Sequence, residues 1–140
     1  MRDLSFPAMG MIEGARALAA GLKSTDPAPE GFGYYDLIAE ADGAMAEGNA
    51  ASARTFLRQA LGIMGNDPGT WLKLASASLS VYDADFAARG RTDYGLASDV
   101  ANAALNAFLR TEGTRERASA LAYLARGLER RHMWRESIAT

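Results

Sequence analysis

The sequence predicts an all-α fold of antiparallel helical hairpins, with about six helices and a truncated seventh. Apolar residues recur at helical spacing along most of the 140-residue chain, and clusters of glycine, asparagine and proline separate these stretches. One short pattern also recurs: the segment 71–75 (Trp-Leu-Lys-Leu-Ala) resembles 37–41, which begins 34 residues earlier, and 121–125, which begins 50 residues later. A 34-residue period is typical of stacked helical hairpins, and a spacing of 50 equals that period plus an insertion of 16 residues.

The first half of the chain predicts three helices. Pro7 suits the first turn of a helix over 7–22, with Ser5 as its cap. Two prolines and two glycines make 24–33 a loop, after which the apolar spacing predicts a helix over 34–47. Gly48 and Asn49 form the next turn, because glycine tolerates a left-handed backbone and asparagine caps the helix predicted over 50–64.

The second half begins at a strong helix boundary, Gly65-Asn66-Asp67-Pro68, where Asp67 caps a helix predicted over 68–82. Glycine and several charges predict that 83–92 is the insertion. Further helices are predicted over 93–110 and 115–131. A turn at 132–134 is then expected to lead into a short seventh helix over 134–140.

These elements form a single helical repeat domain over 1–140. The predicted hairpins cover 34–65, 68–110 with the insertion near 83–92, and 115–140, the last one truncated. Together with the 34-residue period, they resemble tetratricopeptide-like hairpins, which implies a repeat array. A helix of two turns is marginal alone, and a terminal repeat normally carries a polar capping face. We therefore expect the natural chain to continue beyond Thr140.

Composition limits the class of protein. Hydrophobic residues make up 49% of the chain, which indicates a globular domain. The net charge of −2 gives no reason to expect nucleic acid as a partner. No apolar run is long enough to predict a membrane-spanning helix, and the chain as written carries no export signal. The absence of cysteine excludes disulfides and thiolate chemistry.

No motif in the sequence predicts catalysis, a cofactor or a metal. His132 is the only histidine and has no second ligand at usable spacing. The acidic pairs, Glu40 with Asp42 and Asp83 with Asp85, are two residues apart and would point in different directions on a helix. No phosphate-binding glycine loop is present. We expect neither an enzyme nor a small-molecule substrate.

A protein partner, or the rest of its own polypeptide, is the expected partner. In stacked hairpins, the first helix of each unit lines a concave groove. The residues that this spacing places in the groove are Tyr35, Ile38, Asp42, Leu72, Ser76, Arg126 and Glu129. They lack the dense basic clamp of a receptor for carboxylate tails, although Arg126, Arg130 and Arg131 could bind an anion as well as complement the helix dipole. Trp71 is predicted to lie in the core, and Trp134 either packs there or is partly exposed.

Several segments also resemble the helical N-terminal region of bacterial alpha-2-macroglobulin family proteins. The segments that carry the resemblance are 3–6, 71–75, 103–110, 117–122 and 128–135. The resemblance implies a periplasmic protein that traps proteases, in which this chain is an accessory segment. The reactive thioester of that family needs a cysteine, so the trapping chemistry is expected elsewhere.

The leading functional hypothesis is thus a non-catalytic helical interaction or spacer module of a bacterial alpha-2-macroglobulin-like protease inhibitor. The alternative is a free-standing tetratricopeptide-like adaptor, in the cytoplasm, that binds a peptide or protein in its concave groove.

Overall fold

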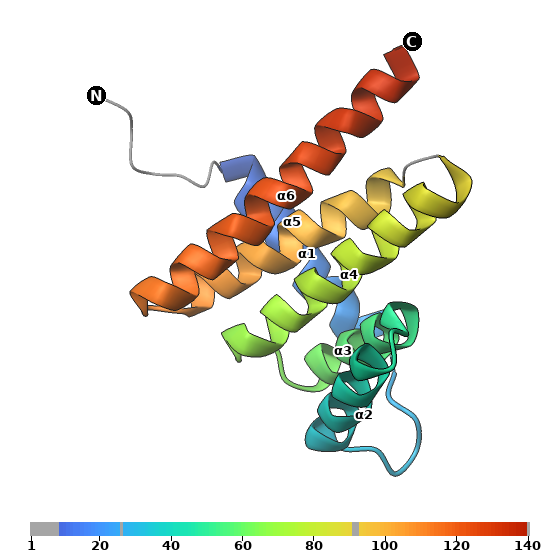
Figure 1. Cartoon of the computed structure of the whole chain (residues 1–140). Helices are drawn as coiled ribbons and strands as arrows, with labels where there is room; N and C mark the ends of the chain where they lie inside the picture. Colours follow the sequence, from blue (N-terminus) through green and yellow to red (C-terminus); the bar gives the residue numbers. More distant parts are fainter. Residues whose placement is uncertain (1–8, 26, 91–92, 140) are drawn as a thin grey trace.

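The computed structural model describes residues 9–25, 27–90 and 93–139 (Figure 1). These residues form helices and contain no strand, which confirms the all-α fold. Six helices are described: α1 (Met9–Thr25), α2 (Tyr34–Ala46), α3 (Ala50–Ile63), α4 (Pro68–Arg89), α5 (Tyr94–Arg110) and α6 (Thr114–Ala139).

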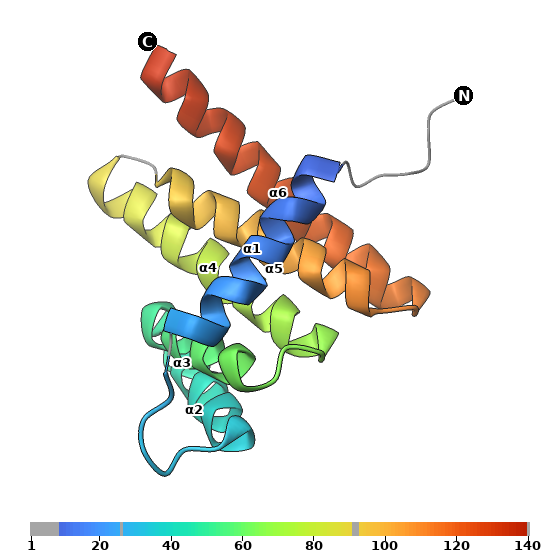
Figure 2. The ribbon, with the colours of Figure 1, turned by 180° about the vertical axis from the view of Figure 1, so that it is seen from behind.

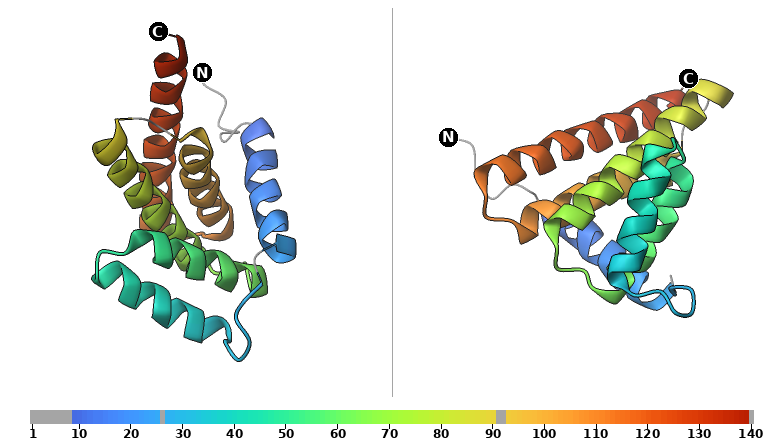
Figure 3. Two further views of the ribbon diagram at one scale, coloured as in Figure 1. Left: turned by 90° about the vertical axis from the view of Figure 1, so that its right-hand side faces the viewer. Right: turned by 60° about the horizontal axis from the view of Figure 1, so that its bottom comes forward.

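Helices that follow one another in the chain pack together from α2 to α6. The long helices α4, α5 and α6 lie alongside one another, while α2 and α3 run crosswise to them (Figure 3). The first helix is the exception, because α1 contacts α3 and α5 rather than α2, and it crosses α5 obliquely (Figure 2). The contacts therefore show neighbouring pairs of helices, and the repeat array remains a prediction.

The interior combines a few large side chains with many alanines. Trp71, Leu57, Leu74, Leu105 and Leu124 are fully buried, and burying each leucine stabilises the fold by about 1.5–3 kcal/mol. Small side chains let the helices approach closely. The buried alanines of the main core are Ala15, Ala41, Ala44, Ala53, Ala75, Ala77, Ala101, Ala103, Ala104, Ala107 and Ala120.

Capping side chains define the starts of α3 and α4, as the sequence predicted. Asn49 accepts a hydrogen bond from the backbone N–H of Ser52 at 3.2 Å, and Asp67 accepts one from Gly69 at 3.0 Å ahead of Pro68. Each capping side chain pairs an amide that has no partner within the helix. The predicted starts of α3 and α4 are thus confirmed.

The prediction that the helix ends before an insertion at 83–92 is wrong. Residues 83–89 continue α4, and Gly90 ends it with a left-handed backbone at a φ of 68°. The charges of Asp83 and Asp85 were misleading, because charged residues are acceptable on the exposed side of a helix. Glycine is the residue that ends it, since it adopts positive φ without strain.

The predicted turn at 132–134 and the seventh helix are also wrong. The last helix, α6, runs without a break from Thr114 to Ala139. Residues 128–139 contain neither glycine nor proline, so nothing in the backbone chemistry ends the helix there. The predicted Ser5 cap, Pro7 and the side chain of Trp134 lie outside the described residues.

Candidate functional site

The seven predicted groove residues lie on three helices. The α2 group is Tyr35, Ile38 and Asp42, the α4 group is Leu72 and Ser76, and the α6 group is Arg126 and Glu129. Side chains bring α2 and α4 together, since Lys73 Nζ of α4 lies 2.7 Å and 2.9 Å from the two carboxylate oxygens of Asp42. No hydrogen bond or ion pair between described residues joins the α4 group to the α6 group. Of the predicted set, Asp42 therefore contacts α4, through a residue that was not predicted.

Members of the predicted set differ in accessibility. Ile38 and Leu72 are half-buried and pack against the core, so they contribute mainly to folding. The side chain of Tyr35 is 77% exposed, and its ring meets that of Tyr34 edge-on at 5.1 Å. Arg126 and Glu129 are exposed on α6. Tyr35 is the large apolar member of the set that is open to a partner.

A buried hydroxyl pair supports the contact between α2 and α4. Tyr34 Oη lies 2.6 Å from Thr70 Oγ1, and the Thr70 hydroxyl in turn donates to Asp67 at 3.3 Å. Burial raises the pKa of Tyr34, because the phenolate is poorly solvated there. The folded chain therefore holds the phenol proton of Tyr34 more tightly than the unfolded chain does. In the unfolded chain, tyrosine has its ordinary pKa of about 10.

Replacing Tyr34 by phenylalanine is expected to cost about 1 kcal/mol of unfolding free energy at neutral pH, since one buried hydrogen bond is lost. A raised pKa in the folded state gives stability that is present below the unfolded pKa and is lost as pH rises through the folded one. Tyr34→Phe should therefore lose less stability than the parent chain between neutral pH and pH above about 10. Urea unfolding at several pH values measures the free energy of unfolding of both proteins. The same dependence of this free energy on pH in both proteins would contradict the prediction.

The cationic side chains near the predicted groove already contact carboxylates or an aromatic ring. Lys73 pairs with Asp42, and Arg130 pairs with Asp83 at 3.3 Å and with Glu129 at 2.6 Å. The guanidinium of Arg126 lies 5.4 Å from the ring centre of Tyr123. These contacts do not gather into a single clamp for an anionic tail.

A second surface, on α6, was not predicted. Ala118, Leu121, Ala122 and Ala125 are exposed and follow the spacing of one helix face; Leu121 is 38% exposed. We call these four residues the α6 stripe. The residues of α6 that face the interior beside this stripe are Ala120, Leu124 and Gly127.

Gly127 is the signal that could have revealed this orientation. A Cβ atom at this position would lie 2.6 Å from the backbone nitrogen of Ala101, so glycine is required where α6 crosses α5. A glycine inside a helix is less favourable than alanine by about 1 kcal/mol, and a close approach of a second backbone is one physical reason for its presence. With Gly127 placed inside, helical spacing also places Ala120 and Leu124 inside and leaves the α6 stripe outside.

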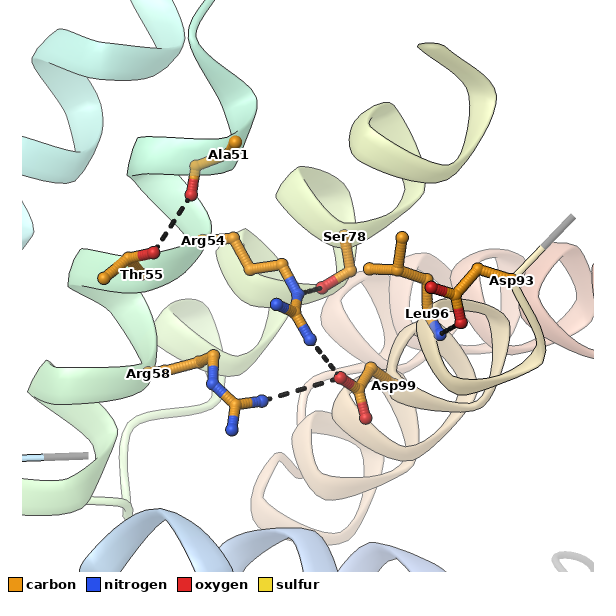
Figure 4. A network of polar contacts seen from close by, with 8 residues as sticks. All are labelled: Ala51, Arg54, Thr55, Arg58, Ser78, Asp93, Leu96 and Asp99. Atoms are coloured by element: carbon orange, nitrogen blue, oxygen red, sulfur yellow. Dashed lines mark hydrogen bonds and ion pairs between the residues drawn. The ribbon is translucent and has the colours of Figure 1, made fainter. Parts of the chain in front are cut away.

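A polar network joins α3, α4 and α5 (Figure 4). Arg54 donates to Ser78 Oγ at 3.2 Å and forms an ion pair with Asp99, which Arg58 also approaches at 3.5 Å. The groups are partly buried, so their pairing is needed to offset the loss of hydration. Sequence periodicity could not predict this network, because its members are far apart in the chain.

No group of three or more histidine, cysteine, aspartate or glutamate side chains in the part of the chain that the structure describes could hold a metal ion. None of the described helices is both long and apolar enough to cross a membrane.

Comparison with models of known protein families, with curated proteins and with solved structures finds no match for this chain.

Proposed function

We propose that this chain is a non-catalytic helical interaction and spacer module that stacks through the α6 stripe. The observation that carries the proposal is the exposure of Ala118, Leu121, Ala122 and Ala125 on one face of α6. Three alanines beside one leucine make a surface that another helix can approach closely, as the alanine-rich helices of the core do. Burying this apolar face would favour association.

The leading form of the proposal is a segment of a bacterial alpha-2-macroglobulin-like protease inhibitor in the periplasm. Its support is the sequence resemblance given above. In this form the α6 stripe packs against a further helical unit of the same polypeptide, and the module sets the distance between neighbouring parts.

The alternative proposal is a free-standing adaptor that binds a peptide or protein through Tyr35, Ser76 and their neighbours. The 77% exposure of Tyr35 favours it, because exposed tyrosine is common in protein interfaces. The pairing of Lys73 and Arg130 with carboxylates counts against it where the ligand is an acidic tail.

Site-specific photo-crosslinking in the natural full-length protein separates the two forms. A benzophenone amino acid at Ala125 should crosslink to a helical segment of the same polypeptide or of a bound protein, and the same probe at Tyr35 should not. A crosslink from Tyr35 with none from Ala125 would establish the adaptor instead. No crosslink from either position would contradict both.

Leu121→Glu should abolish the crosslink from Ala125, because a charge would enter the buried contact. The same change should alter the unfolding free energy of the isolated chain by no more than about 0.5 kcal/mol, since the side chain is partly exposed. Ile63→Glu is the matched control, because Ile63 is an exposed aliphatic residue on α3. The control should keep the crosslink, and its loss there too would show that the effect is not specific to the α6 stripe.

A further inference from the structure

A cleft lies where α1 passes the ends of α3 and α5, on a different part of the molecule from the α6 stripe. It has a volume of about 420 Å³ and is lined by Ala19, Ala20, Lys23, Leu61, Gly65, Asn66, Trp71 and Arg110. A neighbouring hollow of about 560 Å³ shares Ala19 and Arg110 with it and adds Ile12, Arg16, Asn106 and Leu109. Volumes of this size are typical of sites for small ligands.

Three cations lie along the cleft and the neighbouring hollow. Lys23 and Arg16 project from α1, and Arg110 closes the end of α5. No carboxylate is among the described residues that line either hollow. A cleft lined by one sign of charge concentrates ions of the opposite sign, even in a chain whose net charge is −2.

Arg110 is held in a fixed position. Its Nε donates to the carbonyl of Gly65 at 2.6 Å, and one terminal nitrogen donates to Asn106 Oδ1 at 2.7 Å. The guanidinium carbon lies 5.2 Å from the ring centre of Trp71. Burial lowers the pKa of Arg110, yet arginine titrates so far above neutrality that the group keeps its charge.

Lys23 and Arg16 differ from Arg110, because neither has a hydrogen bond or ion pair with any described residue. Lys23 lies in the last turn of α1 and Arg110 at the end of α5, where a cation also complements the helix dipole. Arg16 lies in the middle of α1, too far from the helix end for that explanation, since the dipole effect falls off within one turn.

Apart from Asn66, the remaining residues that line the cleft are alanine, leucine, glycine and tryptophan. Leu61 and Trp71 are fully buried beneath the cleft, and Ala19 and Ala20 leave space above them. The Trp71 ring also reports on the site directly, because its Nε1 donates to the Gly65 carbonyl at 2.8 Å and Gly65 lines the cleft.

We propose that this cleft binds a small carboxylate that carries an apolar group. The carboxylate would lie between Lys23 and Arg110, with Arg16 adding positive charge from the neighbouring hollow. The apolar group would lie against Ala19 and Ala20, above the buried Trp71. The inference does not depend on the proposed spacer function, because it concerns a different surface and a different class of ligand.

Titration of the full chain with 3-phenylpropionate, followed by the NMR signal of the Trp71 indole N–H, tests the proposal. Trp134→Phe leaves Trp71 as the only tryptophan and makes the assignment unambiguous. We expect a saturable shift, with binding weakened at least about threefold when salt is raised from about 0.05 M to 0.5 M, because salt screens the exposed cations. The neutral analogue 3-phenylpropionamide should bind at least about fivefold more weakly.

Substitutions of single cations test which side chains contribute to the binding of 3-phenylpropionate. Arg16→Gln and Lys23→Gln should each weaken 3-phenylpropionate binding about threefold, and together about tenfold. Both variants should fold normally, since these side chains make no polar contact with described residues. Arg115→Gln removes an exposed cation on α6 and should leave affinity unchanged.

Three results would each overturn the proposal: no saturable shift of Trp71, equal affinity for the acid and its amide, or full affinity in the double variant. Equal weakening in Arg115→Gln would also overturn it, because the effect would then come from net charge alone.

Discussion

Replacing Trp71 by alanine is expected to cost about 3–5 kcal/mol of unfolding free energy, the largest effect of any single change considered for this chain. The indole is fully buried in the main core among side chains of α3, α4 and α5. Removing it leaves a cavity, deprives the Gly65 carbonyl of one hydrogen bond and removes the ring over which Arg110 lies. Such a loss is a large fraction of the 5–15 kcal/mol by which domains are typically stable.

Denaturation by guanidinium chloride, followed by circular dichroism, measures this loss. Tyr35→Ala is the matched control, because it also removes an aromatic ring but from a side chain that is 77% exposed. We expect the control to change stability by no more than about 0.5 kcal/mol. Equal losses in the two variants would show that Trp71 is not the centre of the core.

Replacing Gly127 by alanine is expected to destabilise the chain by about 1–3 kcal/mol. The added methyl carbon would lie 2.6 Å from the nitrogen, 2.9 Å from the Cα and 3.0 Å from the Cβ of Ala101. Two of these atoms belong to the backbone of α5, so relief requires moving a whole helix. The clash outweighs the gain of about 1 kcal/mol that alanine normally brings to a helix interior.

Gly43→Ala on α2 is the matched control for Gly127. The Cβ of an alanine at position 43 would have no heavy atom of another residue close by, so the same substitution should stabilise the chain by about 0.5–1 kcal/mol. The two variants should thus shift the thermal midpoint in opposite directions. A rise in both would contradict the close crossing of α5 and α6.

The sequence was most informative where backbone chemistry alone decides the structure. Asn49 and Asp67 mark helix starts through local hydrogen bonds, and the structure confirms both. Charge was a poor guide, because Asp83 and Asp85 lie on a helix as readily as in a loop. The sequence also failed to give the orientation of α6, since alanine is so common there that two faces have similar hydropathy.

The candidate surfaces could be predicted only in part. Asp42, one of the predicted groove residues, contacts α4 through Lys73, but the sequence analysis did not name Lys73 as its partner. The cleft around Arg110 could not be predicted, since it depends on where α1 packs. Helix α1 packs on α3 and α5 instead of on α2, the helix that follows it in the chain. No local sequence pattern encodes that choice.

The position of α1 has a consequence for the order of folding. The Asn106 side chain donates to the carbonyl of Ala15 at 2.9 Å and joins residues 91 positions apart, whereas α2 to α6 pack mainly on their neighbours. Closing a loop of that length costs more conformational entropy than closing a hairpin, so this contact is expected to form late. Helix α1 is therefore expected to dock after α2 to α5, although it precedes them in the chain, and its apolar side stays uncovered until α5 has been synthesised.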